Sequence, residues 1–264
     1  MTEAFAHHLL SVDGRGVAWV TLNRPELHNA FDDRLIAELT GALTRLGGDP
    51  GVRVVVLAGA GRSFSAGADL NWMRAMAAYD EERNRADAER LAVLMRTLDR
   101  LPKPTVAKVQ GPALAGGCGL VACCDIVIAG ERASFGLSEV RLGIIPAVIG
   151  PYMVAAIGAR AARRYFLTGE RFGAHEAHRL GLVSDVVADG ALEDRVAALV
   201  ATLLDNGPCA VAEAKAHIAA IAGRPIDEAM IADSAARIAR LRASPEGREG
   251  IGAFLEKRKP DWQR

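Results

Sequence analysis

Two short stretches of small residues are candidates for holding a ligand with bare backbone. The first, Leu114–Asp125, reads LAGGCGLVACCD and has Gly116, Gly117 and Gly119 just before an apolar run. Glycines lower stability, because they add conformational entropy to the unfolded chain. Free N–H groups at a helix start bind negative charge, and glycine lets a ligand come close to them. The stretch therefore indicates either an anion-binding turn or a turn that packs a helix tightly on a sheet.

The second stretch, Ser63–Leu70, reads SFSAGADL and also precedes a predicted helix, for which Asp69 suits the N-cap. Two strand-to-helix junctions of this kind can aim two N–H groups at one oxygen atom. That arrangement is an oxyanion hole, where losing one donor typically slows catalysis by roughly 10²–10³-fold. Ser63 and Ser65 lack the GxSxG elbow of a serine nucleophile, so we interpret them as loop hydrogen-bonding residues.

A dinucleotide-binding turn is the alternative from another class of protein. Gly117-x-Gly119-x-x-Ala122 fits the GxGxxG/A fingerprint, and Glu139 lies twenty residues beyond Gly119. The fingerprint requires the glycines to follow a strand at once, whereas residues 110–114 separate them from the predicted strand Thr105–Val109. The match is therefore weak.

The elements that must carry these junctions alternate along the first part of the chain. Apolar positions at helical spacing predict helices over Asp32–Leu46 and Glu82–Leu101. Short β-rich runs predict strands at Val17–Leu22, Arg53–Ala58, Thr105–Val109, Asp125–Ala129 and Val183–Val187. The alternation indicates an α/β fold with parallel strands and right-handed crossovers.

The strand pattern stops at about Ala188, and only helices are predicted beyond it. They span Ala191–Asn206, Pro208–Ile221, Ile226–Arg242 and Pro245–Lys259. Ser244-Pro245 has the residue types of a helix start. We therefore expect residues 1–190 to form an α/β core and residues 191–264 to form a C-terminal helical region.

Bulk composition excludes several classes of protein. Half of the 264 residues are hydrophobic, which is enough for a full core. The 32 basic residues balance 32 acidic ones, which argues against partners such as nucleic acid or a membrane surface. The start, MTEAFAHH, does not fit a signal peptide, and no apolar run reaches membrane-spanning length. We expect a soluble cytoplasmic protein.

Residues that often bind metals are present but poorly arranged for that task. The cysteines have no CxxC spacing, and the apolar neighbours of Cys118, Cys123 and Cys124 favour buried, reduced thiols. His175 and His178 have i,i+3 spacing, which favours a surface helix over a metal site. The sequence therefore predicts no metal.

In order, and along nearly its whole length, the chain carries motifs that resemble those of the enoyl-CoA hydratase/isomerase, or crotonase, superfamily. They are Asn23-Arg24-Pro25, Asn29-Ala30, Ser65–Leu70, Lys103-Pro104, Ala115–Cys118, Cys124–Ile126, Glu139–Pro146, Leu167–Gly169, Gly181–Val183 and Phe254–Arg258. The residues in and around these motifs are most similar to those of the bacterial methylglutaconyl-CoA hydratases of leucine breakdown and of the related isohexenylglutaconyl-CoA hydratases.

The resemblance implies an α/β crotonase-type spiral of ββα units, followed by a C-terminal helical trimerisation region. Trimers in the family are often paired as hexamers. It also implies that the N–H groups of Ala68 and Gly116 bind the carbonyl oxygen of an acyl-CoA thioester and stabilise its enolate. Coenzyme A, as part of the substrate, is the only cofactor implied. The CoA-binding residues implied are Ala66, Asp69, Leu70 and, on a late helix of a neighbouring subunit, Phe254 and Lys257.

Proton transfer is where the chain departs from the family pattern. Hydratases of the family usually carry two glutamates; one is present here as Glu139, and Gly119 occupies the other position. Because the methylglutaconyl branch also has this glycine, we predict an enoyl-CoA hydratase with Glu139 as its acid/base. An isomerase is the first alternative, and a non-catalytic CoA binder or a dinucleotide-dependent oxidoreductase is a distant one. A purely structural Glu139, at a helix start capped by Ser138, is the competing interpretation.

Three further residues are predicted to contact the substrate. Gly117 and Gly119 would leave room for the thioester and for a branched acyl chain. Arg74, about one helical turn beyond Asp69, would bind the terminal carboxylate of a glutaconyl chain.

Overall fold

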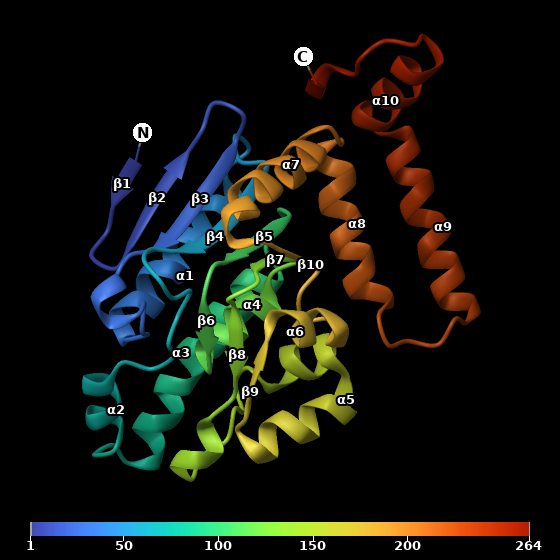
Figure 1. The fold of residues 1–264 in the computed structure, drawn as a ribbon. Coiled ribbons are helices and arrows are strands. Elements are labelled where there is room, and N and C mark those ends of the chain that lie inside the picture. The colour runs from blue at the N-terminus through green and yellow to red at the C-terminus, as the bar shows by residue number, and fades with distance from the viewer. Residues whose placement is uncertain (1, 264) are drawn as a thin grey trace.

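The computed structural model describes residues 2–263 as a body of two β-sheets and surrounding helices, with a helical arm at the C-terminal end (Figure 1). The larger sheet has seven strands in the order β1-β2-β3-β4-β5-β7-β10. Strands β1, β2 and β3 pair antiparallel, and the strands from β3 to β10 in that order pair parallel. These strands are β1 (Thr2–Ala4), β2 (His8–Val12), β3 (Val17–Leu22), β4 (Val54–Gly59), β5 (Thr105–Val109), β7 (Ile126–Gly130) and β10 (Asp185–Val187).

A smaller sheet stands beside the larger one and carries the glycine-rich stretch. Its order is β6-β8-β9, with β6 parallel to β8 and β9 antiparallel to it. The strands are β6 (Pro112–Leu114), β8 (Ser134–Gly136) and β9 (Arg171–Gly173).

The helices connect the strands and then form the arm. Those of the body are α1 (Asp33–Gly48), α2 (Leu70–Met76), α3 (Glu81–Asp99), α4 (Gly116–Cys123), α5 (Gly150–Thr168), α6 (Ala174–Leu180) and α7 (Leu192–Leu204). The arm holds α8 (Pro208–Ile221), α9 (Glu228–Ala243) and α10 (Pro245–Leu255). Short 3₁₀ turns are η1 (Pro25–Leu27), η2 (Glu139–Leu142), η3 (Asp189–Ala191) and η4 (Asp261–Gln263).

Every strand and helix that the sequence predicted is present, with small errors at the ends. Strand β10 begins at Asp185 instead of Val183, because the Leu182 and Val183 N–H groups instead donate to the Ala177 carbonyl, at 2.9 and 3.2 Å. Helix α10 ends at Leu255, because Lys257 has a left-handed φ of 56° that no helix continues through. The sequence did not predict α5 or the strands β1, β2, β6, β8 and β9.

The core lies on both faces of the larger sheet. Strand β4 reads VVVLAG and is buried along almost its whole length, as expected for a central parallel strand. On one face, Val55 and Leu57 belong to the main hydrophobic cluster together with buried residues of α1, α3 and α4. On the other face, Val54 and Val56 pack with Leu192, Val196 and Val200 of α7.

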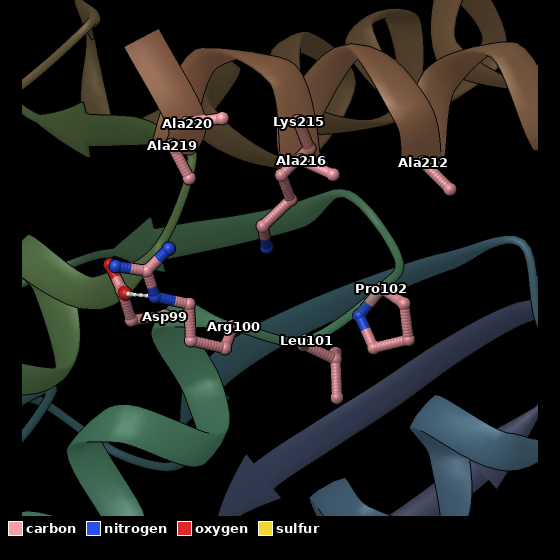
Figure 2. A pocket seen from close by; sticks show the side chains of 9 residues that line it. All are labelled: Asp99, Arg100, Leu101, Pro102, Ala212, Lys215, Ala216, Ala219 and Ala220. Atoms are coloured by element: carbon pink, nitrogen blue, oxygen red, sulfur yellow. Dashed lines mark ion pairs between the residues drawn. The ribbon is translucent and has the colours of Figure 1, made fainter. Parts of the chain in front are cut away.

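The C-terminal arm makes few contacts with the body of its own chain. Helices α8, α9 and α10 project outward in Figure 1, and α8 has no buried residue. The Lys215 ammonium group of α8 contacts Asp125 Oδ2 at 2.8 Å, next to a cavity of about 270 Å³ under α8 (Figure 2). Helix α7 packs on the sheet, and the arm starts only after it. The division of the chain at residue 190 stays a prediction.

Within residues 2–263, no single helix is long and apolar enough to cross a membrane; residues Asp189–Leu204 and Pro208–Ile221 pass that test only together, across a bend of 101°.

Candidate active site

The two stretches of small residues lie side by side, as the predicted oxyanion hole requires. Single β-bridges join Ser65 to Ala113 and Phe31 to Ala68. The Leu114 N–H donates to the Ser65 carbonyl at 2.8 Å, which fixes the second stretch to the first. Residues 65–68 and 113–116 therefore form one continuous piece of backbone structure at the start of α4.

The backbone around this junction leaves two N–H groups without an acceptor. The Phe31 N–H donates to the Gly67 carbonyl and the Asp69 N–H donates to the Phe31 carbonyl, both at 2.7 Å. Ala68 lies between these bonds, and its own N–H has no acceptor within residues 2–263. The Gly116 N–H, at the first position of α4, also lacks an acceptor in this range, as N–H groups of a first helical turn do.

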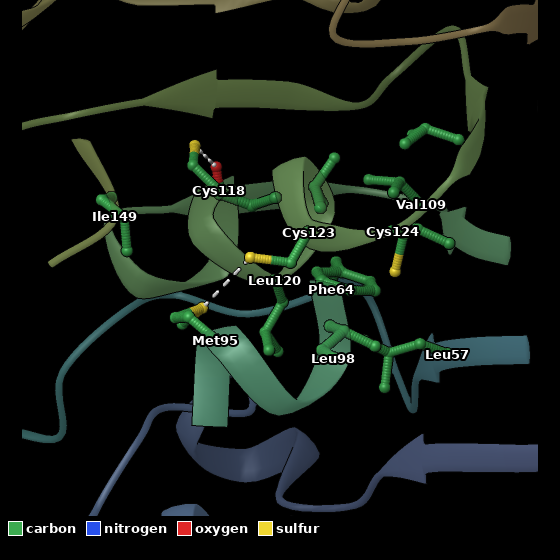
Figure 3. Close-up of a cluster of buried hydrophobic side chains, with 14 of the residues drawn as sticks. Leu57, Phe64, Met95, Leu98, Val109, Cys118, Leu120, Cys123, Cys124 and Ile149 are labelled. Carbon is green, nitrogen blue, oxygen red and sulfur yellow. Dashed lines mark hydrogen bonds between the residues drawn. The ribbon is translucent and has the colours of Figure 1, made fainter. Parts of the chain in front are cut away.

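Two of the three glycines are required by packing, which corrects the prediction that they leave room for substrate. A Cβ at Gly117 would lie 2.8 Å from the Ser65 carbonyl oxygen. A Cβ at Gly119 would overlap the Ile149 side chain, lying 3.0 Å from Ile149 Cβ and 3.1 Å from Met95 Cε. Ile149 is 3% exposed and lies against α4 in Figure 3. The space expected for a branched acyl chain beside Gly119 is therefore filled by Ile149.

The same packing argues against a dinucleotide site. The sequence argument against it, that no strand adjoins the glycines, was wrong. A short strand, β6, ends only one residue before α4, so a strand does nearly adjoin the glycines. However, the second glycine of the fingerprint, Gly119, should let a pyrophosphate approach the backbone, and here it faces the Ile149 side chain. Protein atoms occupy the approach that a phosphate needs.

Glu139 begins the 3₁₀ turn η2 and is half-buried. Its Oε2 is buried and has no hydrogen-bond partner within residues 2–263. Burial raises the pKa of the Glu139 carboxyl, and a hydrogen bond from its own backbone N–H opposes that rise. Ser138 makes no side-chain cap, so the interpretation of Glu139 as a capped helix start loses its main contact. A half-buried carboxyl with an unpaired oxygen is suited to accept and return a proton.

The Cys118 thiol links α4 to the small sheet close to Glu139. Its Sγ–H donates to the Ala113 carbonyl at 2.9 Å (Figure 3), and the charge of Glu139 acts on it. Burial raises the pKa of Cys118 to about 12, so the group stays a neutral thiol. Cys123 and Cys124 are also buried and free, as the sequence predicted.

Asp69 caps α2, as predicted, but its side chain is not free for coenzyme A. Oδ1 accepts from the N–H groups of Asn71 and Trp72 at 2.8 and 3.2 Å, and Oδ2 accepts from Arg24 at 3.1 Å. Burial alone raises the pKa of the Asp69 carboxyl, but these donors together hold that pKa below its ordinary value. Arg24 also pairs with Asp32 Oδ2 at 2.8 Å. The Asp69 carboxylate therefore positions α2, and a CoA contact at Asp69, which stays a prediction, would have to use its backbone.

The other predicted CoA residues lie in two distant parts of the chain. Ala66 is half-buried in the loop before α2, and Leu70, the first residue of α2, is 68% exposed. Phe254 is 81% exposed on α10, and Lys257 follows that helix. Figure 1 shows α2 and α10 at opposite ends of the molecule, so one chain does not bring the two groups together.

Arg74 is exposed on α2, where its guanidinium donates to Asn71 Oδ1 at 2.5 Å.

The expected surface helix with His175 and His178 is α6, and His178 Nδ1 contacts the Val183 carbonyl oxygen at 3.0 Å. Within residues 2–263, no group of three or more His, Cys, Asp or Glu side chains is arranged to hold a metal ion.

Sequence reasoning missed four residues that shape the site. Ile149 fills the space beside Gly119, Phe31 bridges to Ala68, and Arg24 holds the Asp69 cap. Ala115, the fourth, has a positive φ of 46° directly before α4. Arg24 and Ala115 had a signal, since they lie in the Asn23-Arg24-Pro25 and Ala115–Cys118 motifs, but no role was assigned to either.

Comparison with known proteins agrees with this geometry. The family model described as "Enoyl-CoA hydratase/isomerase" matches residues 13–264. A putative enoyl-CoA hydratase of Thermus thermophilus is 37% identical over 252 residues, 96% of this chain and 99% of the relative. A 2,3-dehydroadipyl-CoA hydratase of Escherichia coli is 35% identical over 248 residues, 94% of this chain and 95% of the relative.

A solved structure gives the same result for the fold. The crystal structure of an enoyl-CoA hydratase from Shewanella pealeana superposes with a TM-score of 0.94 at 46% identity, and the match covers 97% of this chain and 96% of the other. The α/β architecture is thus a crotonase fold with a helical C-terminal region, as predicted. The chain belongs to the enoyl-CoA hydratase/isomerase family.

Proposed function

We propose that this enzyme adds water reversibly to a 2-enoyl-CoA thioester, with the N–H groups of Ala68 and Gly116 as the oxyanion hole and Glu139 as the acid/base. The observation that carries the proposal is the pair of unpartnered N–H groups on adjoining backbone segments. Glu139 is the proposed carboxyl group, and it lies three residues beyond Gly136, whose carbonyl accepts from the Ala115 N–H directly before Gly116.

The reaction needs one carboxylate used twice. Ionised Glu139 takes a proton from water while the water oxygen forms a bond to Cβ of the substrate. The electron pair of the double bond moves toward the thioester, whose oxygen becomes an enolate held by the two N–H groups. Glu139 then returns a proton to Cα, and the thioester carbonyl reforms. Water is thus added as hydroxyl at Cβ and hydrogen at Cα, from the same side.

The raised pKa of Glu139 supports both halves of this cycle. A base with an ordinary glutamate pKa is a poor proton acceptor at neutral pH, and a pKa nearer the working pH improves the transfer in each direction.

For the acyl chain we propose methylglutaconyl-CoA, an intermediate of leucine degradation, as the candidate substrate. The residues of the motifs support this choice, because they are similar to those of methylglutaconyl-CoA hydratases. The Escherichia coli relative also supports it, since its named substrate carries a dicarboxylic acyl chain. Arg74 is the candidate partner for the distal carboxylate, because it is exposed and its only ion or hydrogen-bond partner within residues 2–263 is the neutral Asn71.

For the assembly we propose a homotrimer, either alone or paired as a hexamer. Phe254 and Lys257 would then cover the coenzyme A bound at Ala66 and Leu70 of a neighbouring subunit. The proposal is supported by the exposed apolar side chains of the arm, such as Ile231 at 59% and Leu255 at 72% exposure. The free cysteines fit the reducing cytoplasm.

An enoyl-CoA isomerase is the second candidate, because it needs only one carboxylate. The filling of the second acid position by Ile149 is consistent with either reaction. A panel of purified 2-enoyl-CoA and 3-enoyl-CoA esters separates the two. A hydratase removes the absorbance of the conjugated 2-enoyl thioester, whereas an isomerase creates that absorbance from a 3-enoyl ester.

Glu139→Gln tests the catalytic assignment within that panel. The amide has the same shape but cannot take up the proton, so we expect nearly all hydration to be lost while the binding of butyryl-CoA persists. Hydration at close to the wild-type rate in Glu139→Gln would show that another group is the acid/base.

A further inference from the structure

Ala115 has a backbone conformation that alanine rarely adopts. Its φ is 46° and its ψ is −118°, in a region where the Cβ of an L-residue is strained. Two hydrogen bonds hold it there: the Ala115 N–H donates to the Gly136 carbonyl at 2.8 Å, and its carbonyl accepts from the Gly119 N–H at 3.2 Å. The strain is thus maintained by both the small sheet and α4.

This strained residue lies between the two unpartnered N–H groups. The peptide that follows Ala115 carries the Gly116 N–H, so the ψ angle of Ala115 sets the direction of that group. The Ala115 methyl rests against Gly67, where a Cβ would lie 3.0 Å from it. The peptide that follows Gly67 carries the Ala68 N–H, and Gly67 itself has a φ of 88°.

We propose that Ala115 is a positioning residue, whose strained backbone aims the Gly116 N–H and whose methyl group sets the spacing to the Ala68 N–H. The inference rests on the proposed oxyanion hole and adds to it the device that holds its two donors apart. Glycine would adopt the same φ without strain. If only the fold mattered, glycine would be the better residue at this position, and two glycines already follow it.

Ala115→Gly tests the proposal, because it removes the strain and the spacer together. Misplacing a reacting group by about 1 Å can cost 10²-fold in rate, so a donor freed to drift should lower kcat by roughly tenfold. Relief of the strain opposes the entropy that glycine adds to the unfolded chain, so we expect Tm to stay within about two degrees or rise. The Kd of butyryl-CoA, which forms no enolate, should stay within about twofold of the wild-type value.

Ala122→Gly is the matched control, because it makes the same chemical change in the last turn of the same helix. Ala122 is half-buried and lies inside α4, where glycine is unfavourable but no N–H donor is redirected. We expect the opposite pattern for this variant, with a lower Tm and an unchanged kcat. A lower kcat only in Ala115→Gly, together with a lower Tm only in Ala122→Gly, distinguishes positioning from a general effect on stability.

Two outcomes would overturn the positioning role: a wild-type kcat in Ala115→Gly, or a loss of kcat and Tm in parallel. The proposed function fails separately. If the wild-type enzyme hydrates no enoyl-CoA ester, or if Glu139→Gln stays fully active, then the assigned reaction or acid/base is wrong. An inactive Glu139→Gln beside a fully active Ala115→Gly overturns only the role of Ala115.

Discussion

Replacing Gly116 by glycolic acid turns its backbone amide into an ester and removes one N–H without changing any side chain. The structure allows both consequences to be calculated. The Gly116 N–H has no acceptor within residues 2–263, so no intramolecular hydrogen bond of that group is lost. The carbonyl of Ala115 becomes a weaker acceptor for the Gly119 N–H at 3.2 Å, which costs at most about 1 kcal/mol of stability.

Catalysis should lose much more than stability does. Removing one oxyanion donor typically lowers kcat by about 10²–10³-fold, which corresponds to about 2.7–4 kcal/mol of transition-state free energy. The assay follows the absorbance of the enoyl thioester under saturating substrate, alongside denaturant unfolding of the same preparation. Gly116→Pro is not an equivalent test, because the residue before a proline is forced toward extended backbone and Ala115 is not extended.

The control is the same ester at Gly41, in the middle of α1. That substitution removes a real helical hydrogen bond, so unfolding should become easier by about 1 kcal/mol while kcat stays unchanged. An ester at position 116 that turns over substrate at the wild-type rate would refute the oxyanion hole, since no other group in the proposal depends on this N–H.

Three further predictions concern the Glu139 carboxylate, Gly119 and the acyl chain. Burial raises the pKa of Glu139 above 4.5 and the base must be ionised, so kcat/KM in a pH series should fall on the acid side with an inflection above that value; an inflection at 4.5 or below would contradict the burial argument. Gly119→Glu should unfold at a lower temperature and gain no activity, because Ile149 fills the space, and Ile149→Ala added to it should recover part of the lost Tm; a stable, faster Gly119→Glu enzyme would contradict the packing. Arg74→Met should lower the ratio of kcat/KM for methylglutaconyl-CoA over crotonyl-CoA by about tenfold or more, and an unchanged ratio would remove Arg74 as the selector.

Most of the longer helices and strands could be predicted from the sequence, because their burial produces a recognisable pattern of apolar residues. Strands such as β4 are buried on both faces and therefore read as continuous apolar runs. The small sheet has strands of only three residues, which are too short to show any alternation. Helix α5 was missed for another reason: Gly158 interrupts it with a φ of 74°, so no single helical period spans its length.

The site was predictable where chemistry is local and unpredictable where it depends on distant contacts. The Asp69 cap and the small residues before α4 are visible in a window of a few residues. Arg24, which holds that cap, lies 45 residues away from it. The contact between Gly119 and Ile149 joins two elements that share no local sequence signal. Without knowledge of that contact, the missing side chain of Gly119 is easily interpreted as space for substrate.

Packing and catalysis are therefore coupled at the start of α4. Gly117 allows the helix to lie directly on the Ser65 backbone, and Ser65 is bridged to Ala113 on the strand that leads into the helix. A side chain at Gly117 would push the first turn of α4 away from this support and would move the Gly116 N–H with it. Gly117 thus helps to hold the first turn of α4 in place, and with it the Gly116 N–H, whose direction the ψ angle of Ala115 sets. A Cβ at Gly116 would lie 3.2 Å from the Phe31 ring, so all three glycines let α4 lie close to its protein neighbours, and Gly116 also carries the free N–H.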